Sequence, residues 1–327
     1  MTAIDRRTLI TAAALSGLAA PAAAATLGQS IPVPQGFTRF PIWKGPAPGG
    51  EKVTVKEEEA LRKPDGPADD SFFAHIVTPT LTMLRPARPN GAAMLLIPGG
   101  GYTRVAIGHE GYAIARRFAE AGYTCFVLLY RLPADGWAAG ADAPLQDAQR
   151  ALRVIRSLAP REQFSPERIG VIGFSAGGHL AAWLSTRAPR ETYAPRDAID
   201  REPLNLSVAG LMYPVIMMEG PDVHQGSRTQ LLGPNPSPER MKAYSMNMDV
   251  MATGAPPVFL AHALDDRSVP PENSLAMLAA LRALKVPTEC HLFENGGHGF
   301  GLLPPTSPAA PVLWPDLFLS FARRHGV

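Results

Sequence analysis

The chain contains 327 residues, of which 46% are hydrophobic, and it carries a formal net charge of +2 at pH 7. This length allows one large α/β domain or two small ones, with a core that needs neither disulfides nor metals for stability. The nearly balanced charge excludes the strongly basic surface that is typical of nucleic-acid binding, so we expect no nucleic-acid partner.

Residues 1–25 have the features of an export signal: a charged start, an apolar stretch over Leu9–Ala20 and small residues suited to cleavage. Arg6 and Arg7, followed by Thr-Leu-Ile, resemble a twin-arginine signal, with an ordinary secretory signal as the alternative. The apolar stretch is short for a membrane span. We therefore expect a periplasmic or secreted protein with no stable membrane association.

Residues 26–70 are rich in proline and glycine and are expected to cover the surface as ordered loops. One strand is predicted near Glu51–Glu57. A second strand is predicted over Phe73–Leu84. These segments precede a more regular part of the chain, which starts at Ala92.

From Ala92 onward, strands and helices alternate. The predicted strands cover residues 92–97, 123–132, 168–174, 207–216, 256–264 and 288–293, and the predicted helices cover residues 110–122, 144–159, 176–188 and 271–284. Strands that are almost continuously apolar and alternate with helices predict a mostly parallel sheet with helices on both faces. The fold class is therefore doubly wound α/β.

One domain, residues 26–327, accounts for all of these elements. Residues 187–206 form a polar connection that contains prolines. Residues 217–255 contain Gly, Pro and Met and are expected to pass over one edge of the sheet. We predict that this excursion is a cap or a substrate-binding segment.

Cys125 and Cys290 are the two cysteines of the chain. In an exported protein they could form a disulfide. Each lies within an apolar, strand-like run, where a buried free thiol packs well, so we expect two separate thiols. No Cys–His spacing resembles a zinc site, and we expect neither a metal nor an organic cofactor.

Ser175 stands in the pentad Gly-Phe-Ser-Ala-Gly, between an apolar run and a helical pattern. The pentad alone is weak evidence, because a small residue can simply mark a bend. Gly177 and Gly178 would let the strand and the helix approach closely, which leaves the serine on a strained, exposed turn. The helix N-terminus there favours developing negative charge. Ser175 is therefore a candidate nucleophile.

Pro98–Tyr102, with the sequence Pro-Gly-Gly-Gly-Tyr, follows the predicted strand 92–97. Glycines at such a position expose backbone N–H groups, which an acyl-transfer enzyme needs to hold an oxyanion. The segment matches the His-Gly-Gly-Gly type of oxyanion loop, with proline where histidine often stands. A plain turn after a strand is the alternative interpretation.

Asp265 and Asp266 follow another predicted strand, and His298 lies in a glycine-rich loop after the last one. Ligands collect at the carboxyl ends of the strands in open α/β sheets. A serine hydroxyl needs a base to take its proton, and the imidazole needs a carboxylate to fix its tautomer. The order serine, acid, histidine predicts Ser175 as nucleophile and His298 as base, and it leaves either aspartate as the acid.

These motifs resemble the α/β-hydrolase-fold esterases, and most closely the bacterial acetyl-xylan and feruloyl esterase-like group. The resemblance extends from about Pro41 to the C-terminus. The segments that carry it are PGGGY, EGYAIARRFAEAGYTCFVLLYRLP, APLQDAQRALRVIRSLA, GFSAGGHLAA, YPVI, GSRTQLLG, DDRSVPPENS and GGHGFGL. The family's catalytic aspartate lies three residues before a Val-Pro pair, here Val269-Pro270. This implies Asp266 as the acid, with Asp265 capping or orienting the loop.

The resemblance also implies the oxyanion donors, namely the backbone N–H groups of Gly100 or Gly101 and of Ala176. It implies a serine carboxylic-ester hydrolase that acts through an acyl-enzyme on carbohydrate esters, in particular acetyl groups on xylan or its fragments. The alternatives are a general short-chain carboxylesterase or lipase-like enzyme, a serine peptidase and a non-catalytic binding protein of this fold. The expected partner is a small-molecule or oligosaccharide ester.

The remaining candidates concern the substrate pocket. Tyr102 and Trp137 are predicted pocket walls, with ordinary core packing as the alternative. His224, in the excursion, could line the acyl or sugar pocket, although a surface loop histidine is the commoner case. His179 and His262 are expected to be structural, and we expect the histidine of the segment GHEGYAI to brace the oxyanion loop.

Overall fold

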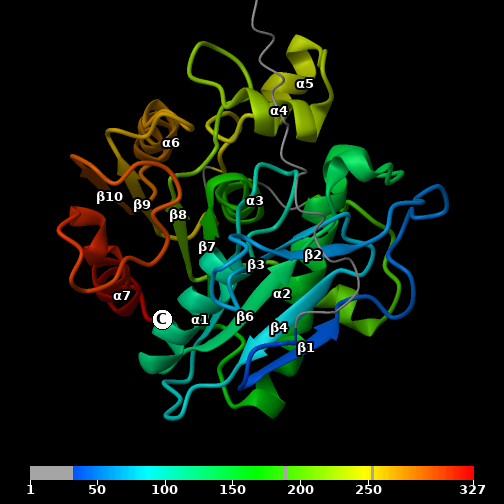
Figure 1. The fold of residues 1–327 in the computed structure, drawn as a ribbon, viewed down its shortest axis with the longest axis horizontal. Coiled ribbons are helices and arrows are strands. Elements are labelled where there is room, and N and C mark those ends of the chain that lie inside the picture. Colours follow the sequence, from blue (N-terminus) through cyan, green and yellow to red (C-terminus); the bar gives the residue numbers. More distant parts are fainter. Residues whose placement is uncertain (1–31, 188–189, 252–253) are drawn as a thin grey trace, which may run out of the picture. The chain divides into compact units, whose positions relative to one another are not determined.

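A computed structural model describes residues 32–187, 190–251 and 254–327 (Figure 1). The predicted export signal lies outside these residues. The strands of the main sheet are β1 (Phe37–Pro41), β4 (Thr80–Leu84), β5 (Ala93–Ile97), β6 (Thr124–Leu129), β7 (Ile169–Phe174), β8 (Val208–Met212), β9 (Val258–Ala263) and β10 (Thr288–Phe293). Their order is β1-β4-β6-β5-β7-β8-β9-β10. From β6 to β10 in this order the neighbours are parallel, while β1 pairs with β4, and β4 with β6, in antiparallel fashion.

The N-terminal part differs from its prediction. β2 (Glu58–Leu61) and β3 (Ser71–Ala74) form a separate antiparallel pair, so the strand expected over residues 51–57 was placed too early. The strand forms four residues or more further along, where β3 is available as a partner. The predicted strand 73–84 is divided into β3 and β4, because the chain turns at His75, whose φ is 52°. Pro79, which cannot donate to a ladder, directly precedes β4.

The predicted helices are present, together with others that the pattern did not reveal. The helices are α1 (Ala113–Glu120), α2 (Ala143–Glu162), α3 (Ser175–Thr186), α4 (Gln225–Leu232), α5 (Pro238–Ala243), α6 (Glu272–Ala283) and α7 (Trp314–Arg324). α4 and α5 lie in the predicted cap segment, residues 217–255, and α7 ends the domain without having been predicted. A π-helical turn, Gly108–Tyr112, precedes α1.

Helices cover both faces of the sheet. On β7, a Cβ added at Gly173 would lie 2.3 Å from the Gly177 carbonyl oxygen of α3. The next residue, Phe174, has its ring 5.9 Å from Trp314 of α7. Since successive side chains of a strand point to opposite faces, α3 and α7 cover opposite faces of the sheet. Phe118 of α1 packs its ring against Trp314, which places α1 beside α7. The doubly wound prediction is confirmed.

The two cysteines are free, as predicted: Cys125 is buried on β6, and Cys290 is partly buried on β10. In the described part of the chain no helix is long and apolar enough to cross a membrane. The loops at the carboxyl ends of β5, β7, β9 and β10 carry the glycine segment, Ser175, the two aspartates and His298. The parallel sheet thus brings these four features to one edge.

Candidate active site

Ser175 is the first residue of α3, directly after β7, and its φ of 50° lies in the left-handed region. A residue with a Cβ is strained in this region, and such strain is common at functional turns. The turn depends on close packing below it, because a Cβ at Gly177 would lie only 2.1 Å from the Ile97 carbonyl oxygen. Glycine at position 177 therefore lets α3 approach β5, which holds the serine at the end of its strand.

His298 joins Ser175 to a carboxylate. Its Nε2 lies 2.8 Å from Ser175 Oγ, and its Nδ1 lies 2.7 Å from Asp266 Oδ2. A carboxylate oxygen accepts, so Nδ1 carries the proton and Nε2 is free to accept from the serine hydroxyl. The structure thus brings together the serine, the histidine and one of the two aspartates that the sequence singled out.

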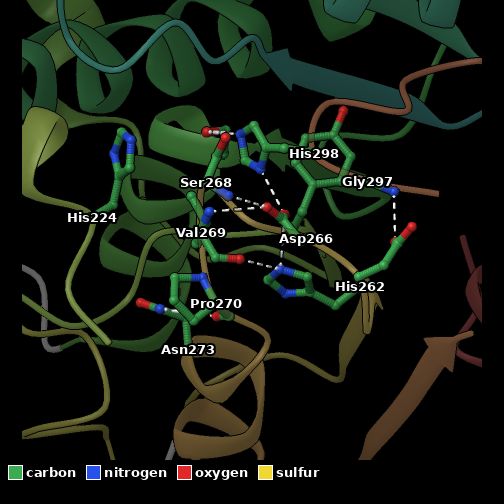
Figure 2. A network of polar contacts seen from close by, with 12 residues as sticks. His224, His262, Asp266, Ser268, Val269, Pro270, Asn273, Gly297 and His298 are labelled. Atoms are coloured by element: carbon green, nitrogen blue, oxygen red, sulfur yellow. Dashed lines mark hydrogen bonds and ion pairs between the residues drawn. The ribbon is translucent and has the colours of Figure 1, made fainter. Parts of the chain in front are cut away.

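Asp266 is buried, and both of its oxygens have partners (Figure 2). Oδ1 accepts hydrogen bonds of 2.9 Å from the N–H groups of Ser268 and Val269. Oδ2 contacts His298 and, at 3.2 Å, Nε2 of the buried His262. Burial alone would raise the pKa of this carboxyl, but the hydrogen bonds from His262 and His298 together hold the pKa below its ordinary value. Asp266 therefore remains a carboxylate.

His262 contacts the site more directly than the structural role expected of it. Its Nε2 lies within 3.2 Å of Asp266 Oδ2 and 3.0 Å of the Val269 carbonyl oxygen, and both of these atoms accept. Nε2 therefore carries the proton, while Nδ1, 2.8 Å from Ser274 Oγ, accepts from that hydroxyl. The signal in the sequence was a histidine four residues before the aspartate, near the end of the strand that leads to the aspartate.

Asp265 occupies a different place from its neighbour. Its Oδ1 accepts a 2.8 Å hydrogen bond from the N–H of Gly297, the residue before His298. Asp265 is exposed, whereas Asp266 is only 5% exposed and contacts the imidazole itself. Asp265 thus orients the histidine loop from outside, whereas the resemblance implied a role in the loop that carries the two aspartates.

The glycine loop offers the donors that an oxyanion requires. The N–H of Gly99 is bonded at 2.7 Å to Glu110 Oε2, which removes it as a candidate. The N–H groups of Gly100 and Gly101 have no acceptor among residues 32–187, 190–251 and 254–327. Gly100 has a φ of 133°, and a Cβ there would lie 2.1 Å from the Arg104 carbonyl oxygen. Ala176 lies in the first turn of α3, where N–H groups have no acceptor within the helix.

A buried bridge, which the sequence analysis missed, links the glycine loop to the histidine loop. Glu110 Oε1 accepts a 2.8 Å hydrogen bond from the Tyr213 hydroxyl, and this hydroxyl accepts one of 3.1 Å from the N–H of Gly301. The Tyr213 ring also lies edge-on to the His298 ring, with centroids 5.2 Å apart. The available signal was a glutamate shortly after an apolar run, Val105–Ile107, in the segment that follows the glycines.

The structure corrects two predicted pocket walls. Tyr102 is 1% exposed and its hydroxyl lies 2.7 Å from Nδ1 of His179, so its side chain belongs to the core. Trp137 is 5% exposed, and its ring packs against the Arg131 guanidinium at 4.8 Å. Neither ring offers a substantial surface to a substrate, because both are covered by their own protein contacts.

The other histidines have defined partners. His179 is fully buried, and its Nε2 lies 2.8 Å from the Tyr244 carbonyl oxygen, so it is structural, as predicted. His109 contacts the Gly299 carbonyl oxygen at 2.9 Å. It therefore braces the histidine loop and not the oxyanion loop, which corrects the expectation for the segment GHEGYAI. Across the residues that the structure describes, no group of three or more His, Cys, Asp or Glu side chains could hold a metal ion.

His224 lies at the beginning of α4, in the predicted cap segment. Its Nδ1 is 2.8 Å from Ser227 Oγ and 3.2 Å from the Ser227 backbone nitrogen. Burial is the largest influence that lowers the pKa of His224, the charge of His298 adds to it, and Asp266 opposes it. His224 is thus within electrostatic reach of the acid and the histidine, although no dashed line joins its ring to theirs in Figure 2.

Solved structures that are similar to this chain include esterases. The acetyl ester-xyloside bifunctional hydrolase from Caldicellulosiruptor lactoaceticus is 33% identical with a TM-score of 0.71, over 90% of this chain and 98% of that one. The carboxylesterase Cest-2923 from Lactobacillus plantarum is 26% identical with a TM-score of 0.63, over 83% of this chain and 98% of that one. This chain has the α/β-hydrolase fold that the resemblance implied.

Among curated proteins, an acetylxylan esterase of Xylanibacter ruminicola is 34% identical over 221 residues, which are 66% of this chain and 42% of that protein. Endo-1,4-beta-xylanase B of Butyrivibrio fibrisolvens is 34% identical over 63% of this chain and 32% of its own length. This chain thus matches less than half of either relative. The BD-FAE family model matches residues 84–281, which is more than half of the chain. The chain belongs to the BD-FAE family.

Proposed function

We propose that this protein is a serine carboxylic-ester hydrolase that removes acetyl groups from xylan fragments or other plant-derived carbohydrate esters. The observation that carries the proposal is the continuous chain of contacts from Asp266 through His298 to Ser175, at 2.7 and 2.8 Å. The acetylxylan esterase relative and the acetyl ester-xyloside hydrolase support the choice of substrate.

The reaction has two acyl-transfer steps. His298 takes the proton of Ser175 Oγ as the oxygen attacks the ester carbonyl, and Asp266 stabilises the imidazolium that forms. The N–H groups of Gly100 or Gly101 and of Ala176 hold the oxyanion, and each such donor typically contributes about 100- to 1000-fold in rate. His298 then gives its proton to the leaving alcohol. Water, activated by the same imidazole, cleaves the acyl-serine and regenerates the enzyme.

A general short-chain carboxylesterase is the second candidate. It is favoured by the likeness to the carboxylesterase of Lactobacillus plantarum, which covers 83% of this chain. The two candidates share the serine and the histidine and differ only in the alcohol that they accept. A comparison of sugar esters with simple esters therefore separates them.

The test is release of acetate from acetylated xylo-oligosaccharides, with p-nitrophenyl acetate and octanoate in parallel and Ser175→Ala as the control. We expect acetate release that falls about a thousand-fold or more in the variant, because the nucleophile and its base act as a unit. Hydrolysis of the nitrophenyl esters alone would favour the general carboxylesterase. Activity of Ser175→Ala near that of the wild type would contradict the assignment of the nucleophile.

We also propose that the protein is exported to the periplasm or the medium. The support is the sequence of residues 1–25, with Arg6 and Arg7 before an apolar stretch that ends in small residues. Export suits a substrate that is derived from a polymer. Fractionation of cells that express the wild type and an Arg6→Lys/Arg7→Lys variant tests it. If export follows the twin-arginine route, the variant should stay in the cytoplasm while the wild type is exported. Equal export of the wild type and the variant would indicate an ordinary secretory signal.

A further inference from the structure

His224 presents one nitrogen to the protein and keeps the other free. The N–H of Ser227 is directed at Nδ1, and the Ser227 hydroxyl lies 2.8 Å from the same atom. A backbone N–H can only donate, so Nδ1 is the accepting nitrogen and the neutral ring carries its proton on Nε2. Nε2 has no hydrogen-bond partner in the part of the chain that the structure describes. His224 thus offers one oriented donor that the fold does not use.

Two anchors fix the position of this donor. Asn273, which is fully buried, accepts hydrogen bonds from the N–H groups of Ile216 and Met217 and donates one of 2.9 Å to the Asp222 carbonyl oxygen. The chain that leads to His224 is therefore tied to the helix that follows the acid loop. Figure 2 shows His224 and Asn273 in the same view as Asp266.

The second anchor is the glycine loop. Ser227 is fully buried, and a Cβ added at Gly101 would lie 3.9 Å from its hydroxyl oxygen. The first turn of α4 therefore packs against one of the candidate oxyanion residues. His224 is half-buried, and its electrostatic environment is set in part by His298 and Asp266. The free Nε2–H donor accordingly lies beside the site, and its position is fixed by the contacts of Asn273 and of Ser227.

The chemistry indicates which half of a substrate faces this donor. The leaving alcohol takes its proton from Nε2 of His298, so the alcohol half of the ester must lie on the His298 side of Ser175. His224 begins the helix whose first turn packs against Gly101, and Figure 2 shows its ring in the same view as that of His298, so we place it beside this half. A neutral N–H donor there matches the hydroxyl oxygens of a sugar better than it matches a carboxylate or an alkyl chain.

We propose that His224 is a substrate-binding residue whose Nε2–H donates a hydrogen bond to a free hydroxyl adjacent to the scissile ester in the alcohol half. This inference rests on the esterase function proposed above and adds the feature of the alcohol that is recognised. An analogue that lacks this hydroxyl leaves the positioned donor unpaired, which lowers its kcat/KM.

Gly226 leaves space for this contact. A Cβ at position 226 would lie 3.3 Å from His224 Cε1 and 3.7 Å from Nε2. Alanine at this position would thus crowd the edge of the ring that carries the free donor, while His224 and its bonds to Ser227 remain in place. Gly226→Ala therefore serves as a second variant that obstructs the contact without removing the imidazole.

The experiment is a double-mutant cycle in which one change is made in the enzyme, at or beside His224, and the other removes the hydroxyl from the substrate. The substrates are methyl 2-O-acetyl-β-xylopyranoside and its 3-deoxy analogue, in assays short enough that the acetyl group does not migrate. The variants are His224→Asn and Gly226→Ala, with kcat/KM as the readout. Asparagine is a good N-cap residue, so His224→Asn keeps the beginning of α4 and removes the ring donor. Thermal unfolding of both variants checks the fold.

The expected result is a wild-type preference of about tenfold for the hydroxyl-bearing ester, the effect of one hydrogen bond. His224→Asn should lose most of this preference, and Gly226→Ala should lose part of it. The inference is overturned if His224→Asn keeps the preference, or if the wild type shows none. In either case, hydrolysis of both esters that depends on Ser175 would still support the esterase function. Hydrolysis of neither ester, nor of p-nitrophenyl acetate, would overturn the proposed function itself.

Discussion

The acid and histidine loops, residues 264–270 and 294–301, contact Ser175 and each other, whereas the cap segment contacts the glycine loop, and the two regions are built differently. Each oxygen of Asp266 has a hydrogen-bond partner, and His298 uses both ring nitrogens. In the cap segment, by contrast, Arg228 Nε and Asn247 Oδ1 are buried without a hydrogen-bond partner in the described part of the chain. Native proteins satisfy most buried polar groups, so this difference calls for a physical reason.

The reason we offer is a division of tasks. Asp266 and His298, which handle the proton, are held in a single orientation by their hydrogen bonds. Preorganised catalysis requires such fixed groups. The cap segment keeps unused donors and acceptors, among them Nε2 of His224. Unused polar groups in this segment are suited to recognising a polyhydroxylated substrate. The predictions below vary each side of the site in turn.

The largest effect is expected at Asp266. Asp266→Asn should lower kcat about 1000- to 10,000-fold, because the amide can donate to Nδ1 of His298 and favours the wrong tautomer. Asp265→Asn is the matched control and should lower kcat less than tenfold, since the amide oxygen can still accept from Gly297. Steady-state kinetics on p-nitrophenyl acetate compares them. Equal losses in the two variants would mean that the acid role is shared.

The next effect concerns the attachment of the cap segment. The pKa of the buried His179 is lowered to about 4 by burial. Its neutral ring donates from Nε2 to the Tyr244 carbonyl oxygen and accepts at Nδ1 from the Tyr102 hydroxyl. The unfolded chain takes up this proton near pH 6.5, and the folded one does so only near pH 4. The free energy of unfolding should therefore fall as the pH drops from 6.5 to 4, by about 3 kcal/mol in total.

Urea unfolding across this pH range, in wild type and His179→Gln, measures the effect. The variant begins from a lower stability but has no proton to take up at this position. Its stability should therefore fall less steeply between pH 6.5 and pH 4. Parallel curves for the two proteins would show that His179 does not couple the cap segment to acid.

The smallest effect is expected at the bridge between the two loops. Tyr213→Phe removes the hydroxyl that donates to Glu110 and accepts from the N–H of Gly301. We expect a loss of about 1 to 2 kcal/mol in the free energy of unfolding and a three- to tenfold fall in kcat, with KM changed less. A fall in stability without any change in kcat would limit the bridge to a structural role.

Most residues of the site could be predicted from the sequence, because each stands in a short local motif. Ser175, the glycine loop and His298 each stand in a short motif at the end of a strand, and a parallel sheet brings such ends together. The residues alone left the choice between Asp265 and Asp266 open, and the resemblance favoured Asp266. The structure shows Asp266 in contact with His298.

The parts that escaped prediction depend on packing between distant segments. Glu110 meets Tyr213 across 103 positions of sequence, and no local pattern announces such a pair. Tyr102 was predicted as a pocket wall, with core packing as the alternative, and its ring lies in the core. The same limit explains the strand that was placed before β2, because strand position depends on a partner that a single segment does not contain.

The central claim is that His298 and Asp266 activate Ser175, and covalent labelling tests it most directly. A fluorophosphonate probe followed by peptide mass spectrometry should give one adduct, on the peptide that contains Ser175. The adduct should be absent in Ser175→Ala and should form far more slowly in Asp266→Asn. An adduct at another residue, no adduct in the wild type, or equal labelling rates in wild type and Asp266→Asn would contradict the account.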